Sequence, residues 1–282
     1  RLGLIAENGV YTTGINDLPT TPSPPERRPR SLIVRSTAIR RPFCASIRRG
    51  KMPPAGLCNP GWWHVQLRCF HHGTSIMLTA LEALDRLKTG NRRFVAGLRD
   101  GEGVSTPRRM QLPDDQEPFA TILGCSDSRV PAELVFDQGL GDLFVIRVAG
   151  NVVAPSQVGS VEFATAMFGT ALVVVLGHTR CGAIEATLRE LERPHTSRSP
   201  NLRSIVDRIR PSVRSLMDTP LDSDRDALIH YAVRANIRAS VDHLAHGSQL
   251  LEQYIESGKL LVVGAEYDLE TGEVDFFDGI PE

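Results

Sequence analysis

The stretch "TALVVVLGH", Thr170 to His178, is the strongest strand signal in this chain. Its nearly continuous run of valine and leucine is typical of a parallel strand buried on both faces, whereas a strand with one solvated face alternates apolar and polar residues. Two earlier stretches, "FATILGCS" (Phe119 to Ser126) and "DLFVIRVAG" (Asp142 to Gly150), have the same apolar character. We therefore predict that all three are buried strands of one sheet.

Helical patterns lie between and around these strands. Leu78, Leu81, Leu84 and Leu87 recur at helical spacing, and Gly90 follows as a plausible C-cap. Further helices are predicted over 92–98, 156–169, 181–193, 201–217 and 223–257, and a polar loop over 99–117. "KLLVVGAEYD" predicts a further strand, and "DLETGEVDFF" adds a hairpin signal with Thr-Gly at its turn. This alternation predicts an α/β fold with a mainly parallel central sheet flanked by helices.

The first quarter of the chain differs from the rest in composition. Residues 1–75 carry eleven Lys or Arg and three Asp or Glu, whereas the remainder carries 21 basic and 30 acidic residues. Sequence rich in proline and arginine fits an organelle targeting segment, a disordered basic tail, or upstream sequence foreign to the native protein. We expect residues 1–76 to be such an extension and residues 77–282 to form the folded domain, beginning at Met77. The expected location is cytoplasmic, or mitochondrial or plastid if the extension is a genuine targeting segment.

Composition also excludes several classes of function. The acidic main body argues against nucleic acid as a partner. No apolar run reaches the roughly 20 residues of a transmembrane helix, so no membrane partner is expected. The five cysteines, an odd number, do not suggest a disulfide framework and favour a reducing compartment. A zinc site from Cys58, Cys69, His71 and His72 is conceivable, but their spacing fits no standard zinc finger.

Two of the predicted strands end in residues that bind metals. The first ends at Cys125, and the second leads into "GHTRCGA", which contains His178 and Cys181. Because sites in open α/β sheets form at the carboxyl ends of strands, both features point to the same edge of the sheet. Two sulfurs and one imidazole nitrogen are ligands that zinc prefers, and three protein ligands leave a fourth position open, as in catalytic zinc sites. Each of these two features also has a simpler explanation when it is considered alone. Cys125 could be a small apolar residue of the core, and Gly177–His178 could be a turn after the strand.

The fourth position could be filled in two ways. Asp127 lies two residues after Cys125 and could bind the metal directly, which would close the site. It could instead pair with Arg129, because a bidentate arginine–carboxylate pair is strong and directional, and so leave a water on the zinc. Zinc lowers the pKa of such a water towards neutrality. Two thiolates donate more charge than imidazoles, so we expect that pKa to be higher here unless neighbouring hydrogen-bond donors offset them.

These residues resemble the β-class carbonic anhydrases. The resemblance rests on "CSDSR" (Cys125 to Arg129), "FVIRVAGN" (Phe144 to Asn151), "SVEFA" (Ser160 to Ala164) and "GHTRCGA" (Gly177 to Ala183), and it extends from about Leu78 to the end of the chain. It implies reversible hydration of CO2 to bicarbonate and a proton, with one Zn²⁺ per chain. It also implies that Cys125, His178 and Cys181 are the zinc ligands and that Asp127 and Arg129 are the catalytic dyad, with Asp127 on the metal in the family's inactive form.

The resemblance further implies a substrate pocket and an oligomer. Gln116 matches a glutamine that hydrogen-bonds the substrate across the dimer interface, Phe144 and Phe163 match an apolar pocket for CO2, and Gly182 falls in the same pocket. The family forms dimers with exchanged N-terminal helical arms, which often pair into tetramers, so a homodimer or homotetramer is expected. The simpler explanations are core packing for the two phenylalanines and solvation for Gln116.

One position departs from a subgroup of the family. The bicarbonate-inhibited members carry tryptophan three residues before the first ligand cysteine, where this chain has Ile122. We therefore predict that Asp127 stays paired with Arg129 at neutral pH. Two other functions remain open at this point. Relatives on this fold hydrolyse CO2 analogues such as carbonyl sulfide or carbon disulfide, and a zinc-stabilised scaffold without catalysis is the third possibility, although it would have no need of the dyad.

Overall fold

A computed structural model describes residues 78–99, 101–112, 116–193 and 199–281 of the chain. The predictions for the 1–76 extension, the domain start at Met77 and the Cys58, Cys69, His71 and His72 cluster lie outside the described residues.

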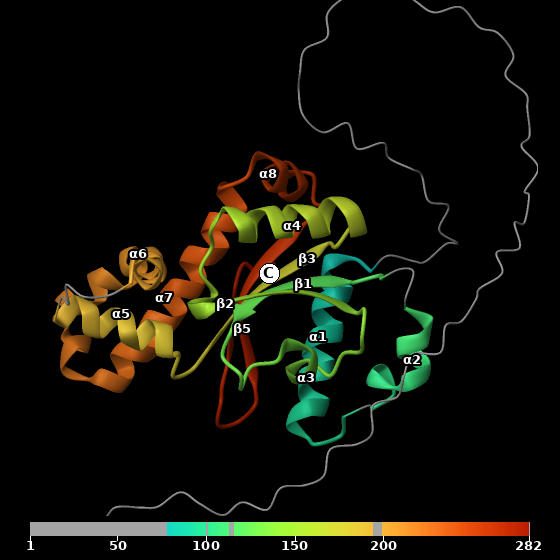
Figure 1. Ribbon diagram of the computed structural model, residues 1–282, viewed down its shortest axis with the longest axis horizontal. Coiled ribbons are helices and arrows are strands. Elements are labelled where there is room, and N and C mark those ends of the chain that lie inside the picture. Colours follow the sequence, from blue (N-terminus) through green and yellow to red (C-terminus); the bar gives the residue numbers. More distant parts are fainter. Residues whose placement is uncertain (1–77, 100, 113–115, 194–198, 282) are drawn as a thin grey trace, which may run out of the picture. The chain divides into compact units, whose positions relative to one another are not determined.

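The centre of the described domain is a five-stranded sheet in the order β2-β1-β3-β4-β5 (Figure 1). The strands are β1 (Ala120–Cys125), β2 (Leu143–Val148), β3 (Leu172–His178), β4 (Leu261–Tyr267) and β5 (Val274–Asp278). The first four are parallel, and β5 pairs antiparallel with β4. Every residue of β1 and β3 is buried, as their continuous apolar sequences predict. The predicted mainly parallel α/β fold is therefore confirmed.

Helices cover both faces of this sheet (Figure 1). The helices are α1 (Ala80–Val95), α2 (Thr106–Gln111), α3 (Ala132–Val135), α4 (Pro155–Phe168), α5 (Gly182–Glu192), α6 (Pro200–Val213), α7 (Arg225–His246) and α8 (Gln249–Glu256). Short 3₁₀ turns are η1 (Glu102–Val104), η2 (Ala149–Asn151), η3 (Arg214–Asp218) and η4 (Pro220–Ser223). One apolar core joins the sheet to α4–α8, and a second joins it to α1 and α3. The described part of the chain contains no helix with the length and apolar character needed to cross a membrane.

The prediction that a helix ends at Gly90 is wrong, because α1 continues through it to Val95. Gly90 packs so closely against another segment that a Cβ there would lie 1.8 Å from the carbonyl oxygen of Phe136. The glycine therefore serves a close approach between α1 and the end of α3 rather than a helix end. The predicted second helix over 92–98 is the last turn of α1, and Gly97 just beyond the helix has the positive φ of 69° that helix ends favour.

The predicted single helix over 223–257 is also wrong. It is two helices, α7 and α8, separated by Gly247 and Ser248. Ser248 begins α8 as its N-cap, since its Oγ accepts a hydrogen bond from the backbone N–H of Leu251 over 3.3 Å. The same hydroxyl donates to Glu162 of α4 over 2.6 Å, a tertiary contact that the local pattern does not reveal. The segment 99–117, predicted as a polar loop, contains two short helices, η1 and α2. The predicted hairpin of β4 and β5 is confirmed, and Gly272 in its turn has a φ of 78°.

Candidate metal centre

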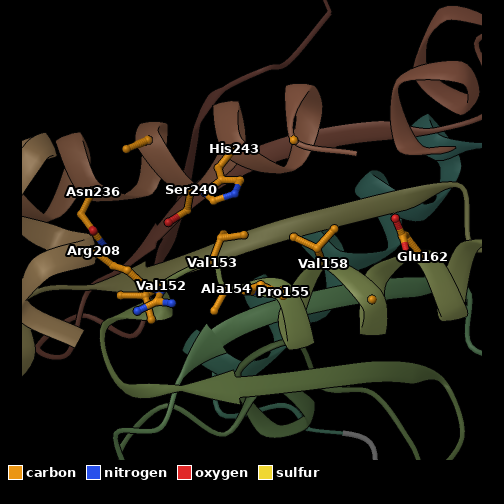
Figure 2. A pocket seen from close by; sticks show the side chains of 13 residues that line it. Val152, Val153, Ala154, Pro155, Val158, Glu162, Arg208, Asn236, Ser240 and His243 are labelled. Atoms are coloured by element: carbon orange, nitrogen blue, oxygen red, sulfur yellow. The ribbon is translucent and has the colours of Figure 1, made fainter. Parts of the chain in front are cut away.

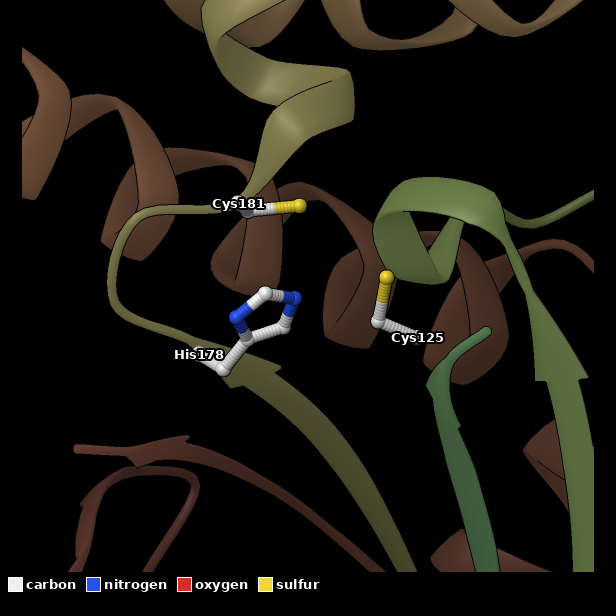
Figure 3. A group of neighbouring side chains, drawn as sticks. All are labelled: Cys125, His178 and Cys181. Carbon is white, nitrogen blue, oxygen red and sulfur yellow. The ribbon is translucent and has the colours of Figure 1, made fainter. Parts of the chain in front are cut away.

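Three buried side chains meet at the carboxyl edge of the sheet. Cys125 is the last residue of β1, His178 is the last residue of β3, and Cys181 immediately precedes α5. β1 and β3 are adjacent parallel strands, so their ends bring these residues together although they are more than fifty positions apart in sequence. The ligand atoms of the three side chains lie within 4.8 Å of one another (Figure 3). The predicted grouping of these residues is present in the structure.

The histidine is held in the tautomer that a metal ligand needs. Its Nδ1 lies 2.8 Å from the carbonyl oxygen of Thr179, which can only accept, so Nδ1 carries the proton and Nε2 keeps its lone pair. Nε2 is buried and makes no hydrogen bond with the described residues, although a buried acceptor ordinarily has a partner. An unpaired imidazole nitrogen beside two sulfurs is the donor set of a site that can hold a metal ion.

The two thiols are electrostatically coupled. The hydrogen bond from Cys181 holds the pKa of Cys125 well below its usual value, and burial opposes this effect. The same hydrogen bond raises the pKa of Cys181, because that thiol keeps its proton to donate it. The backbone N–H of Gly150 also points at the Cys125 sulfur, with 3.4 Å between nitrogen and Sγ. The pair thus supplies one thiolate readily, and a divalent cation would displace the remaining proton as it bound.

Asp127 and Arg129 lie beside this cluster. The Arg129 Nε and Nη2 donate to the two carboxylate oxygens of Asp127 over 2.9 and 2.7 Å, and the Arg129 backbone N–H adds a third hydrogen bond of 3.0 Å. The guanidinium holds the pKa of the Asp127 carboxyl well below its usual range. The Asp127 Oδ2 lies 3.8 Å from the His178 Nε2, so the carboxylate faces the metal cluster. Asp127 and Arg129 are thus paired in this structure, and the persistence of the pair beside bound zinc at neutral pH stays a prediction.

Arg147 fixes the backbone of the segment from Cys125 to Asp127. From β2 its Nε donates to the carbonyl of Cys125 over 3.0 Å, and its Nη2 donates to the carbonyl of Asp127 over 2.5 Å. These contacts hold the backbone at both Cys125 and Asp127. In the sequence analysis Arg147 has no role at the site. Gly150 was missed altogether, and its position just after a strand that ends beside Cys125 is the signal that could have found it.

The predicted pocket residues are placed differently. Phe144, Phe163 and Phe168 form a group of their own, with ring centroids 5.6–6.2 Å apart. In the β1–β2 register Phe144 pairs with Thr121, whereas Cys125 pairs with Val148, four residues further on and roughly 13 Å away at about 3.3 Å per residue. Within one chain the phenylalanines therefore do not line the metal cluster. Phe163 is 50% exposed, so core packing does not explain it.

Gly182 and Gln116 are described but their predicted roles remain predictions. Gly182 is the first residue of α5, beside Cys181, and a Cβ there would meet no atom within 4 Å. Open space at this point is compatible with a substrate pocket. Gln116 is exposed in the segment that leads into β1.

Comparisons with known proteins agree with this site. A family model described as carbonic anhydrase matches residues 120–274, which include the cysteines, the histidine and the dyad. Carbonic anhydrase 2 of Mycobacterium tuberculosis (strain CDC 1551 / Oshkosh) is 39% identical over 196 residues, covering 69% of this chain and 91% of that protein. The carbonic anhydrase of Mycolicibacterium smegmatis (strain ATCC 700084 / mc(2)155) is 39% identical over 191 residues, covering 67% of this chain and 89% of that protein.

The fold is also found among solved structures. The β-carbonic anhydrase CafA of the fungal pathogen Aspergillus fumigatus is 26% identical, with a TM-score of 0.54 over 62% of this chain and 82% of the fungal chain. The family match spans more than half of the chain, and the sequence relatives cover about two thirds of it. Together with the mainly parallel sheet and the Cys125, His178 and Cys181 cluster at its edge, these similarities show that the chain belongs to the β-class carbonic anhydrase family.

Proposed function

We propose that the protein catalyses the reversible hydration of CO2 to bicarbonate and a proton with one zinc ion per chain. The observation that carries this proposal is the buried cluster of Cys125, His178 and Cys181 with an ionised Asp127 beside it. A closed structural zinc site has four protein ligands and no use for a neighbouring carboxylate held by an arginine. An open catalytic site needs both a free ligand position and such a group.

Cys125, His178 and Cys181 would hold the zinc. Two sulfurs and an imidazole nitrogen favour zinc over the hard cations calcium and magnesium, which bind oxygen. When bound, zinc supplies a Lewis acid that lowers the pKa of water towards neutrality and so provides a nucleophile.

Asp127 would accept a hydrogen bond from the attacking water. Its Oδ2 faces the cluster, 3.8 Å from the His178 Nε2. Because its pKa is held low by Arg129, Asp127 stays ionised and only accepts, which turns the water's lone pair towards the carbon of CO2. Arg129 keeps Asp127 in this orientation through its two side-chain hydrogen bonds, and it competes with the metal for the same oxygens.

A second copy of the chain would complete the substrate pocket. CO2 is apolar and needs an apolar wall, yet Phe144 and Phe163 lie away from the chain's own metal cluster on a partly exposed face. A group of three phenylalanine rings, of which Phe163 is exposed and the other two are partly buried, is costly in water and supports an interface here. We infer that a homodimer, or a tetramer built from it, places these rings and Gln116 beside the partner's site.

The substrate can be tested directly against its closest competitor. Stopped-flow CO2 hydration and carbonyl sulfide hydrolysis are measured on one zinc-loaded preparation of the full chain. The proposal expects CO2 hydration far above the buffer rate, with a kcat/KM at least about a hundredfold greater than for carbonyl sulfide. The reverse ratio would assign the protein to the hydrolysis of CO2 analogues, and no turnover of either substrate would favour the scaffold.

A further inference from the structure

We propose that Asn236 of α7 is a positioning residue that controls how strongly the Cys125 sulfur donates to a bound metal, acting through Gly150. The inference rests on the proposed function only in that it takes Cys125 to be a metal ligand. It concerns a residue more than a hundred positions away from Cys125 in the sequence, and no motif of the metal site includes it.

Two glycines of the sheet bring α7 unusually close. A Cβ on Gly177 of β3 would lie 2.5 Å from the Ile237 Cδ1, and a Cβ on Gly264 of β4 would lie 2.9 Å from the Ile237 Cγ2. Ile237 is fully buried, so this contact fixes the distance of α7 from the sheet. The neighbouring residue on the helix, Asn236, is thereby held against the segment that follows β2. Asn236 as a whole is only 3% exposed.

Asn236 and Ser240 bind the η2 turn that follows β2. The Asn236 Nδ2 donates to the carbonyl of Gly150 over 2.8 Å, and the Ser240 Oγ donates to the carbonyl of Asn151 over 3.0 Å. The last two of the three residues of the turn have positive φ, 66° for Gly150 and 43° for Asn151. Positive φ is uncommon outside glycine, although asparagine adopts it more readily than most residues, and contacts with the surroundings hold it in place. Two side chains one helical turn apart on α7 supply these contacts.

The η2 turn directs a backbone N–H towards the metal cluster. With its carbonyl held by Asn236, Gly150 presents its N–H to the Cys125 Sγ over 3.4 Å. The position admits only glycine, because a Cβ would lie 2.9 Å from the Ile209 Cδ1 and 3.0 Å from the Ala183 Cβ. The path from α7 to the sulfur is therefore a single chain of two hydrogen bonds through one residue.

A hydrogen bond from a backbone N–H changes how strongly the Cys125 sulfur donates electrons to a metal. A donor aimed at a thiolate draws electron density from it and weakens its donation to the metal. Two thiolates in one site would otherwise donate more charge than the imidazoles of a three-histidine site, which works against the Lewis acidity that the proposed reaction needs. The Gly150 N–H offsets part of this excess, and Asn236 keeps it in place.

Asn236 can be replaced without overfilling its surroundings. It lines a cavity of about 620 Å³ between α4, α6 and α7 whose wall also includes Val152, Val153 and Ser240. Figure 2 shows Asn236 and Ser240 extending from α7 towards the segment that carries the two valines. Leucine has nearly the size and shape of asparagine and cannot donate, so Asn236→Leu removes the hydrogen bond and retains most of the packing.

The test uses cobalt as a spectroscopic substitute for zinc in the full chain. Cobalt bound to thiolates shows sulfur-to-metal charge-transfer absorption whose energy reports how electron-rich the sulfur is. We expect Asn236→Leu to bind cobalt and to shift this absorption to longer wavelength, because the Cys125 sulfur becomes more electron-rich when it loses the hydrogen bond. Ser240→Ala removes the α7 hydroxyl that donates to the Asn151 carbonyl of the same η2 turn, and it is expected to shift the absorption in the same direction by less.

Asn91→Leu is the matched control. Asn91 is also buried and donates its amide to backbone carbonyls, of Val135 and Gly272, but it does not touch the η2 turn. It should lower Tm and leave the charge-transfer absorption unchanged. A folded, cobalt-bound Asn236→Leu with the parent's absorption overturns the inference. If that variant does not fold, Ser240→Ala decides in the same way. The absorption is read without substrate, so it is separate from any failure of CO2 hydration.

Discussion

Arg129 holds both carboxylate oxygens of Asp127, through hydrogen bonds of 2.9 Å to Oδ1 and 2.7 Å to Oδ2, while Oδ2 lies 3.8 Å from the metal-facing nitrogen of His178. The carboxylate thus stands between the arginine and the metal cluster. Its position allows it to orient a water when paired with Arg129, and would allow it to bind the metal if that pair opened. The behaviour of this one side chain is the first point to test.

Asp127→Asn should lower kcat for CO2 hydration by at least about a hundredfold, because the amide also donates and no longer fixes the water's orientation. Zinc content, measured by elemental analysis, should stay near one per chain. Asp207→Asn is the control, since Asp207 forms a comparable pair with Arg210, at 3.2 Å, on the remote helix α6. Loss of zinc from Asp127→Asn would instead make Asp127 an essential ligand.

Two glycines in helices should respond oppositely to alanine. Gly159→Ala in α4 adds a Cβ that meets no atom within 4 Å, so it should raise the free energy of unfolding by about 0.5–1 kcal/mol through helix propensity. Gly90→Ala in α1 places its Cβ 1.8 Å from the Phe136 carbonyl oxygen and should lower it by about 1–3 kcal/mol. Urea unfolding of the two variants measures both changes. Equal effects would mean that α1 does not pack against Phe136 in this way.

Glu266 should give the domain a pH-dependent stability. Burial raises the pKa of this carboxyl, although the charges of His230 and Arg234 oppose the rise. A folded-state pKa above the unfolded value of about 4.3 means that the folded state binds the proton more tightly, so this contribution is present at low pH and is lost as pH rises through the folded pKa.

The comparison is between the parent and Glu266→Gln, which cannot titrate. The parent's free energy of unfolding relative to Glu266→Gln should fall as pH is raised from about 4.5 to 8. Urea unfolding at several pH values measures it, and Glu256→Gln, at an exposed position on α8, shows the effect of removing a charge alone. A difference that stays constant or grows with pH would show that Arg234 outweighs burial.

The exposed phenylalanine face should be an interface between copies of the chain. Phe163→Ala removes the ring that is 50% exposed and contacts both Phe144 and Phe168. We expect weaker self-association in sedimentation velocity and a lower kcat/KM for CO2, because one change would affect both the interface and the pocket. Leu202→Ala, at an exposed leucine of α6, is the control and should change neither. A parent protein that is monomeric at micromolar concentration and fully active would contradict the dimer.

Features with a strong local pattern were predictable from the sequence. Runs of consecutive apolar residues predict the strands β1 and β3. Because the carboxyl ends of parallel strands lie at one edge of a sheet, these strands also predict that Cys125 lies near His178 and Cys181. The Asp127–Arg129 pair was also predictable, because the two residues are only two positions apart in the sequence.

The remaining features depend on contacts between distant segments. Gly90 looks like a helix end until Phe136 is placed against it, and Ser248 begins a new helix while bonding Glu162, 86 positions away. Asn236 reaches Gly150 across another 86 positions, so no local pattern marks either residue as part of the metal site. The predicted N-terminal extension and the location of the protein in the cell stay predictions.

Titration of the metal-free full chain with zinc tests the central claim most directly. CO2 hydration is followed by stopped flow after each addition. The titration is repeated at several pH values between about 7 and 9, because zinc lowers the pKa of bound water towards this range. We predict a rate that rises linearly with added zinc and saturates at one zinc per chain. A protein that binds one zinc per chain yet hydrates CO2 no faster than buffer at every pH in this range would contradict it.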